Sequence, residues 1–137
     1  MKRVILTSNP YRDDNFKTAR SALQILRDAG IDARLCLPFE VDKTFPLPKD
    51  LRFFSLDREL QNAELVICFG GDGTILHMAK AATRAGLPLL GIVPEDSDVM
   101  LAATCQKPLL CYTKKGAAAA CKRIANRIKG YQTPIRL

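Results

Sequence analysis

The sequence has 137 residues, of which 47% are hydrophobic and 26% charged, a balance typical of a globular domain that buries a core. It has no apolar stretch of 18 residues, which argues against a membrane-spanning helix, and its first apolar run at 4–6 is too short for a signal peptide. The net charge of +7 comes from residues 114–137, which carry seven basic side chains and no acidic one. We therefore expect a soluble cytoplasmic protein with a single domain over residues 1–137.

Cysteine and histidine usage argues against a metal centre. The chain has one histidine and five cysteines without C-x-x-C spacing, at Cys36, Cys68, Cys105, Cys111 and Cys121. Zinc sites usually draw four ligands from closely spaced cysteines and histidines. We expect no metal-ligating residues, and we interpret the cysteines as reduced and structural.

Strand-like and helical patterns alternate in the first half of the chain. The apolar run at 4–6 predicts a strand, and apolar side chains at every third or fourth position over 16–26 predict a helix. A second strand is expected at 31–37. The proline-rich stretch at 38–54 is interpreted as a long irregular connection. The continuous apolar run at 64–69 is typical of a third strand buried on both faces.

The second half continues the alternation. A helical pattern at 74–86 is followed by an apolar run at 87–93, which predicts a fourth strand, and the run at 107–112 predicts a fifth. The last helix, at 114–129, is basic on one face and rich in alanine on the other. Since its apolar face has no Phe, Trp or Leu to insert into a membrane, we expect it to pack on the sheet with its basic face in solvent.

This alternation of strands and helices defines the expected fold class. It predicts an α/β fold, a single three-layer domain around a five-stranded parallel sheet with right-handed crossovers. The strand order expected is the flavodoxin-like, Rossmann-like order 2-1-3-4-5. In such sheets ligands bind beyond the carboxyl ends of the strands, where the order reverses. The end of the third strand lies at that place.

A glycine-rich turn, Gly70-Gly71-Asp72-Gly73, follows the third strand directly. Glycines permit unusual backbone angles and close approach of a ligand, and the next helix offers unpaired N–H groups to a phosphate. A carboxylate repels phosphate, so Asp72 is not expected to bind phosphate directly. Its position indicates that it accepts a proton from a hydroxyl group or binds Mg²⁺ together with phosphate oxygens. The alternative is a tight structural turn in which Asp72 caps the helix. The turn is neither a P-loop nor a G-x-G-x-x-G fingerprint.

Other polar residues are expected near the same edge of the sheet. Asn9, after the first strand, is a candidate ligand contact and Arg12 a candidate phosphate contact; a simple turn explains both equally well. His77 lies one turn into the helix, where we expect a partly exposed surface position.

The motif GGDGT, from Gly70 to Thr74, resembles the signature of NAD kinases, and ICFGGDGTILHMAKAATRAGLPLLGI is similar to bacterial NAD kinases in particular. The resemblance covers residues 1–92, the amino-terminal half of that family's catalytic unit. It implies ATP and NAD as substrates with Mg²⁺, and it implies that Asp72 activates the ribose 2′-hydroxyl of NAD. The residues assigned to nucleotide binding are Gly70, Gly71, Gly73, Thr74 and Asn9.

The remainder, 93–137, resembles the carboxyl-terminal part of MinD/ParA-type division ATPases. The similar stretches are LLGIVPED, QKPLL and a helix of the AAxAxxRIAxRI kind. In that family the segment Pro94-Glu95-Asp96 lies beside the bound adenine. The Walker-type loop and the membrane-targeting helix of that family have no counterpart here. We therefore expect a chimera, in which a MinD-like segment completes the sheet of an NAD kinase-like half.

Three functions follow from these resemblances. The first is an NAD kinase-like phosphotransferase that is weak or inactive, because the β-rich second domain of NAD kinases has no counterpart in this sequence. The second is a non-catalytic chimeric α/β scaffold with residual nucleotide binding, and the third is a MinD/ParA-like partner module. The expected partners are nucleotide small molecules, with no specific nucleic acid and no membrane, and a homo-oligomer is left open.

Overall fold

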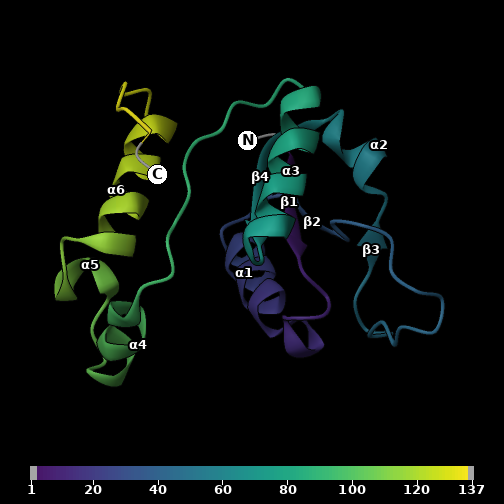
Figure 1. The fold of residues 1–137 in the computed structure, drawn as a ribbon, viewed down its shortest axis with the longest axis horizontal. Coiled ribbons are helices and arrows are strands. Elements are labelled where there is room, and N and C mark those ends of the chain that lie inside the picture. Colours follow the sequence, from purple (N-terminus) through teal and green to yellow (C-terminus); the bar gives the residue numbers. More distant parts are fainter. Residues whose placement is uncertain (1–2, 136–137) are drawn as a thin grey trace. The chain divides into compact units, whose positions relative to one another are not determined.

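The computed structural model describes residues 3–135, and the chain divides into two compact units, Met1–Pro88 and Leu89–Leu137 (Figure 1). The first unit contains the sheet and the helices η1, α1, α2 and α3, and the described part of the second unit contains three helices and no strand. None of the helices formed by residues 3–135 combines the length and the apolarity that crossing a bilayer requires.

The sheet of the first unit has four parallel strands in the order β3-β2-β1-β4. Their bounds are β1 (Arg3–Ser8), β2 (Ala33–Cys36), β3 (Phe53–Phe54) and β4 (Ala63–Phe69). β1 lies in the middle, and its residues Val4, Ile5 and Leu6 are fully buried. The three strands expected first along the chain are confirmed, and so is their relative order, with the first between the second and the third. The third of them, β4, is an edge strand and only half-buried, so the expected burial on both faces is wrong.

Helices cover both faces of this sheet. The helices of the first unit are η1 (Asp14–Phe16), α1 (Lys17–Asp28), α2 (Leu56–Leu60) and α3 (Asp72–Arg84). Successive strand residues point to opposite faces. Leu6 therefore packs with Leu23 of α1, whereas Ile5 packs with Leu60 of α2 and Ala81 of α3. The first unit is thus a three-layer α/β arrangement with two small cores.

The expected fourth and fifth strands do not form, so the five-stranded order 2-1-3-4-5 is wrong. Residues 87–93 form neither strand nor helix, and the run at 107–112 contains α5 (Leu109–Tyr112). A short apolar run is compatible with either a strand or a helix. Proline is tolerated at the start of a helix, but it has no N–H to donate to a neighbouring strand, so Pro108 favours a helix here. The fourth strand of the sheet is instead β3, a two-residue strand in the stretch expected to be irregular.

The second unit contains α4 (Ser97–Thr104), α5 and α6 (Gly116–Ile128). The carboxylate of Asp96 accepts hydrogen bonds from the backbone N–H of Asp98, 3.0 Å away, and of Ala117, 2.8 Å away. One side chain therefore caps the amino ends of two helices. Gly116 has a φ of 52°, and a Cβ at this position would lie 2.1 Å from a carboxylate oxygen of Asp96, so only glycine fits there.

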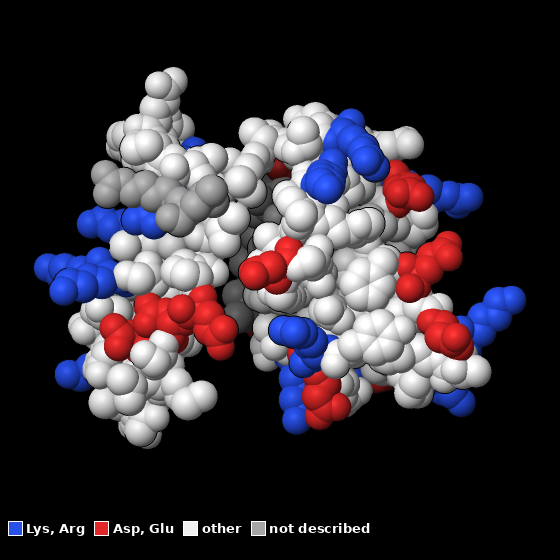
Figure 2. Space-filling model, in the orientation of Figure 1, with Lys and Arg blue, Asp and Glu red and all other residues white. Residues whose placement is uncertain are grey.

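The last helix is confirmed as α6, but only part of its expected apolar face is buried, since Cys121, Ala125 and Ile128 are exposed. Ala117, Ala118 and Ala120 are buried, whereas Lys122 and Lys129 are exposed. Figure 2 shows the Lys and Arg side chains projecting into solvent from the second unit. Arg127 differs from this pattern, because its guanidinium donates hydrogen bonds to the backbone carbonyls of Leu90, Thr133 and Pro134.

Candidate functional site

The glycine turn joins the carboxyl end of β4 to the amino end of α3. The helix begins at Asp72, two residues earlier than the sequence pattern indicates, and Gly71 is its N-cap residue. The carbonyl of Gly71 accepts the first helical hydrogen bond from Ile75, over 3.0 Å. The backbone N–H groups of Asp72, Gly73 and Thr74 precede this first bond, as expected for the first turn of a helix. They supply partly positive donors at the edge where a ligand was expected.

Close packing requires glycine at Gly70, whereas at Gly71 an added Cβ would meet only the end of a flexible side chain. A Cβ on Gly70 would lie 2.8 Å from the Cβ of Thr74, and a Cβ on Gly71 would lie 3.1 Å from a guanidinium nitrogen of Arg12. None of the three glycines of the turn has a positive φ, so unusual backbone angles are not the reason for glycine here. A Cβ on Gly73 would meet no heavy atom within 4 Å, which leaves the first turn of α3 open to an approaching group.

Asn9 and Thr74 lie next to each other across the turn. The side-chain amide of Asn9 donates a hydrogen bond to the hydroxyl of Thr74 over 3.0 Å, and its carbonyl accepts one from the N–H of Tyr11 over 2.9 Å. The backbone N–H of Asn9 also donates to the carbonyl of Phe69, over 3.0 Å. Thr74 is only 7% exposed. The structure thus places both residues where they hold the end of β1 against the start of α3.

Asp72 differs from its neighbours because its carboxylate has no partner among the residues that the structure describes. It is exposed in the first turn of α3, and no side chain or backbone group within residues 3–135 forms a hydrogen bond or an ion pair with it. The alternative of a helix-capping aspartate is not what the structure shows, since α3 has no side-chain cap. An exposed carboxylate in this position is suited to accept a proton from the hydroxyl group of a ligand.

Two basic residues, Arg12 and His77, come from the segments that border the same turn. Arg12 contacts Gly71 and, within residues 3–135, pairs with no carboxylate, so its charge is available to an anion. His77 is exposed on α3, as expected for a surface position.

An aromatic cavity beside Arg12 was not anticipated from the sequence. It has a volume of about 320 Å³ and lies between the segment after β1 and the proline-rich stretch at 38–54. The ring of Tyr11 meets that of Phe45 edge-on at 5.0 Å and is stacked with that of Phe39 at 6.2 Å. The sequence feature that could have indicated this cavity is the alternation of prolines and phenylalanines in 38–54. It has no regular spacing that would predict residues lining a cavity.

The arrangement of the acidic side chains suits a metal ion that is bound jointly with a nucleotide better than one that is bound by protein side chains alone. Within residues 3–135 there is no group of three His, Cys, Asp or Glu side chains that could hold an ion. Mg²⁺ commonly binds one or two carboxylates together with phosphate oxygens and water. Asp72 fits that mode, with the nucleotide supplying the other oxygens.

Asp96, expected beside an adenine from the MinD/ParA resemblance, has a structural role here. Both of its carboxylate oxygens accept backbone N–H groups, and these hydrogen bonds from Ala117 and Asp98 lower its pKa. The resemblance of residues 93–137 to those ATPases stays a prediction.

Comparison with known proteins assigns most of the chain. Residues 4–94 match the model of the ATP-NAD kinase N-terminal domain. The NAD kinase of Corynebacterium diphtheriae is 36% identical over 94 residues, covering 66% of this chain and 30% of the relative. The NAD kinase of Mycolicibacterium paratuberculosis is 33% identical over 102 residues, covering 66% of this chain and 33% of the relative.

The matched region has clear bounds. The chain spans about a third of the length of the curated relatives it matches. No solved structure matches it. The glycine turn, Asn9 and Arg12 all lie within the matched residues 4–94, and so the chain belongs to the ATP-NAD kinase N-terminal domain family.

Proposed function

We propose that this chain supplies the nucleotide-phosphate side of an NAD kinase-type phosphotransferase, with ATP as phosphoryl donor and NAD as acceptor. The observation that carries the proposal is the exposed carboxylate of Asp72, which has no partner within residues 3–135 and lies beside the open backbone of Gly73. The family and its relatives, named as NAD kinases, support the same reaction.

Each group at the turn has a part in this reaction. The carboxylate of Asp72 takes the proton of the ribose 2′-hydroxyl as its oxygen bonds to the γ-phosphorus, and the bond from that phosphorus to the departing ADP breaks. The N–H groups at the start of α3 and the guanidinium of Arg12 bind phosphate oxygens. Gly73 lets the phosphate come close. Asn9 and Thr74 hold the turn in place, and bound Mg²⁺ offsets phosphate charge.

The open position of Asp72 favours a second candidate, nucleotide binding without efficient turnover. Phosphoryl transfer is fast only when both reactants are oriented and water is excluded. In the first unit Asp72 and Gly73 are both exposed. We therefore expect this chain by itself to bind nucleotide and to form NADP slowly or not at all.

The decisive experiment measures NADP formed from NAD, ATP and Mg²⁺ by the wild type and by Asp72→Asn. Asp57→Asn is the matched control, because Asp57 is also an exposed acid in the first turn of a helix. We expect Asp72→Asn to abolish NADP formation and Asp57→Asn to leave it unchanged. If the wild type forms measurable NADP, an equal rate in Asp72→Asn would exclude Asp72 as the base.

Calorimetric titration with ATP, ADP and NAD tests the binding candidate. Heat of binding in the wild type, without NADP formation, would support a binding module. No heat at millimolar nucleotide would refute both candidates for the isolated chain.

A further inference from the structure

A second cavity lies at the amino ends of β2 and β3, at the opposite end of the parallel sheet from the glycine turn. Its volume is about 410 Å³, within the range of about 300–1,000 Å³ that small-molecule sites occupy. Nothing in the proposed reaction uses it. Its lining residues are Arg27, Ile31, Asp32, Ala33, Arg34, Arg52 and Phe54.

The strand register gathers two of the three arginines. Leu35 of β2 is paired with Phe53 of β3, so Arg34 and Arg52, one position earlier, lie side by side. The guanidinium carbons of both lie over the ring of Phe54, at 4.8 and 4.5 Å from its centroid. Stacking on one ring restricts both side chains and leaves two like charges close together.

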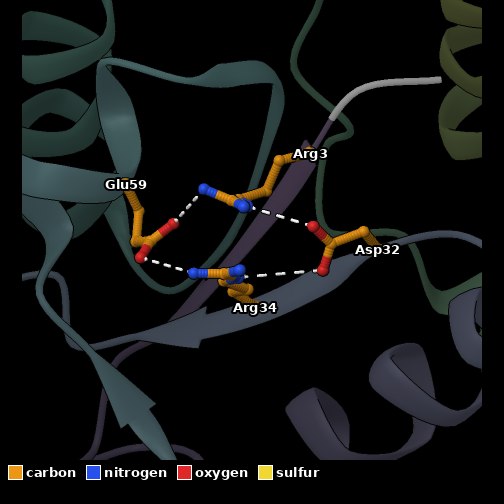
Figure 3. Close-up of polar contacts among 4 residues, drawn as sticks. All are labelled: Arg3, Asp32, Arg34 and Glu59. Carbon is orange, nitrogen blue, oxygen red and sulfur yellow. Dashed lines mark hydrogen bonds and ion pairs between the residues drawn. The ribbon is translucent and has the colours of Figure 1, made fainter.

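A closed ring of ion pairs neutralises Arg34 but not the others (Figure 3). Arg34 and Arg3 each reach both Glu59 and Asp32, with the two contacts to Glu59 at 2.9 and 2.8 Å. Two positive and two negative groups balance within this ring. Arg27 and Arg52 stand outside it, and within residues 3–135 neither has a carboxylate partner.

We propose that this arginine cavity binds the phosphate group of a small phosphorylated, hydroxylated metabolite, a phosphate monoester of sugar or nucleoside size. Arg27 and Arg52 bind the phosphate, since planar guanidinium groups match phosphate oxygens in pairs. The bound anion also relieves the repulsion between Arg52 and Arg34. Asp32, more than half exposed at the rim, accepts a hydroxyl of the same ligand.

A small ligand fits these observations better than a nucleic acid does. A phosphate backbone is bound by a stripe of basic side chains that follows it. Here Arg27 and Arg52, which have no carboxylate partner within residues 3–135, line one cavity and do not form a stripe along the surface.

The experiment is a calorimetric titration of the full chain at constant ionic strength. The ligands are inorganic phosphate, ribose 5-phosphate, AMP and phosphate-free ribose. We expect the two monoesters to bind more tightly than inorganic phosphate, and ribose not to bind. Arg52→Gln and Arg27→Gln should each weaken monoester binding about tenfold or more, because each removes a hydrogen bond from a charged donor to the phosphate. Arg58→Gln, an exposed arginine on α2 outside the cavity, is the matched control.

Several outcomes would overturn the proposal. One is equal monoester affinity in wild type and in the Arg27→Gln, Arg52→Gln double variant, shown by circular dichroism to be folded. Another is binding that Gly73→Ala removes and the arginine variants keep, which would assign the ligand to the glycine turn. A third is tighter binding of a single-stranded oligonucleotide than of AMP with the same dependence on the arginines, which would indicate a nucleic-acid surface.

Discussion

The side-chain amide of Asn9 donates a 3.0 Å hydrogen bond to the hydroxyl of Thr74, which is 65 positions further along the chain. This bond joins the end of the central strand β1 to the first turn of α3. Because the carboxylate of Asp72 lies in the same turn, the bond also determines where that carboxylate is presented.

The first prediction concerns this pair. Asn9→Ala and Thr74→Val should each lower the free energy of unfolding by about 1 kcal/mol, because each leaves a polar partner without its hydrogen bond. The double variant should cost less than the sum, with a coupling of about 0.5–1.5 kcal/mol. Urea denaturation of the four proteins measures it, and strict additivity would show that the bond contributes nothing.

The second prediction contrasts two glycines of the turn. Gly70→Ala should destabilise the protein by about 1–3 kcal/mol, because its Cβ would lie 2.8 Å from that of Thr74. Gly73→Ala meets no atom and should stabilise α3 by about 0.5–1 kcal/mol. Yet Gly73→Ala should weaken ATP binding, since its methyl occupies the approach to the helix N–H groups. Thermal unfolding and calorimetry separate the two effects; a variant that binds ATP normally would count against a phosphate at Gly73.

The third prediction is a pH dependence at Asp13. Burial raises the pKa of this carboxyl, but hydrogen bonds from Thr18, Ser8 and Ala19 outweigh it, so the pKa is lowered from 3.8. A lowered folded-state pKa means that the stabilisation is complete above the unfolded pKa and is lost as pH falls through the folded pKa.

Asp13→Ala should therefore cost about 1 kcal/mol at pH 7, the usual value of a helix-capping side chain. Its difference from wild type should shrink as the pH falls below 3.8. Urea unfolding at pH 7 and pH 3 gives both values. The matched control is Asp14→Ala, which removes a carboxylate that is 90% exposed and should change little. A cost at pH 3 equal to that at pH 7 would contradict the cap.

The fourth prediction tests the ion-pair ring of Figure 3. The Glu59 side chain is only 10% exposed and accepts hydrogen bonds from Arg3 and Arg34, so Glu59→Gln removes the negative charge and leaves one acceptor oxygen for two guanidinium donors. We expect a loss of about 2 kcal/mol in unfolding free energy. Asp57→Asn, on the same helix but exposed, serves as control. A loss no larger than that of the control would show that the ring adds no stability.

The fifth prediction concerns thiol reactivity. Cys105, Cys111 and Cys121 are exposed free thiols, whereas Cys36 is buried. Burial, with the nearby charge of Glu59, raises the pKa of Cys36 to about 12, so almost no thiolate is present at neutral pH. A thiol reagent at pH 8 should label the three exposed cysteines rapidly and Cys36 only after denaturation. Mass spectrometry of the labelled peptides identifies the sites, and rapid labelling of Cys36 would contradict its burial.

The sequence by itself determined those strands, helices and turns that are specified by residues close together in the chain. Apolar runs at 4–6, 31–37 and 64–69 form parallel strands in the expected order, and the turn after the third lies at the carboxyl edge of the sheet. These strands are bounded by turn residues and separated by helical periodicity, so few other arrangements satisfy them. The chemistry assigned to Asp72 stays a prediction, based on a carboxylate among glycines directly before a helix.

Only the tertiary structure decided which short apolar runs become strands. The run at 87–93 resembles a strand but stays irregular, while Phe53 and Phe54 join the sheet because their rings find partners in Phe16 and Arg34. The arginine cavity likewise depends on the β2–β3 register and on where α1 ends. Such features arise from pairing between residues distant in sequence, and a local pattern contains no information about which distant partner will pack against it.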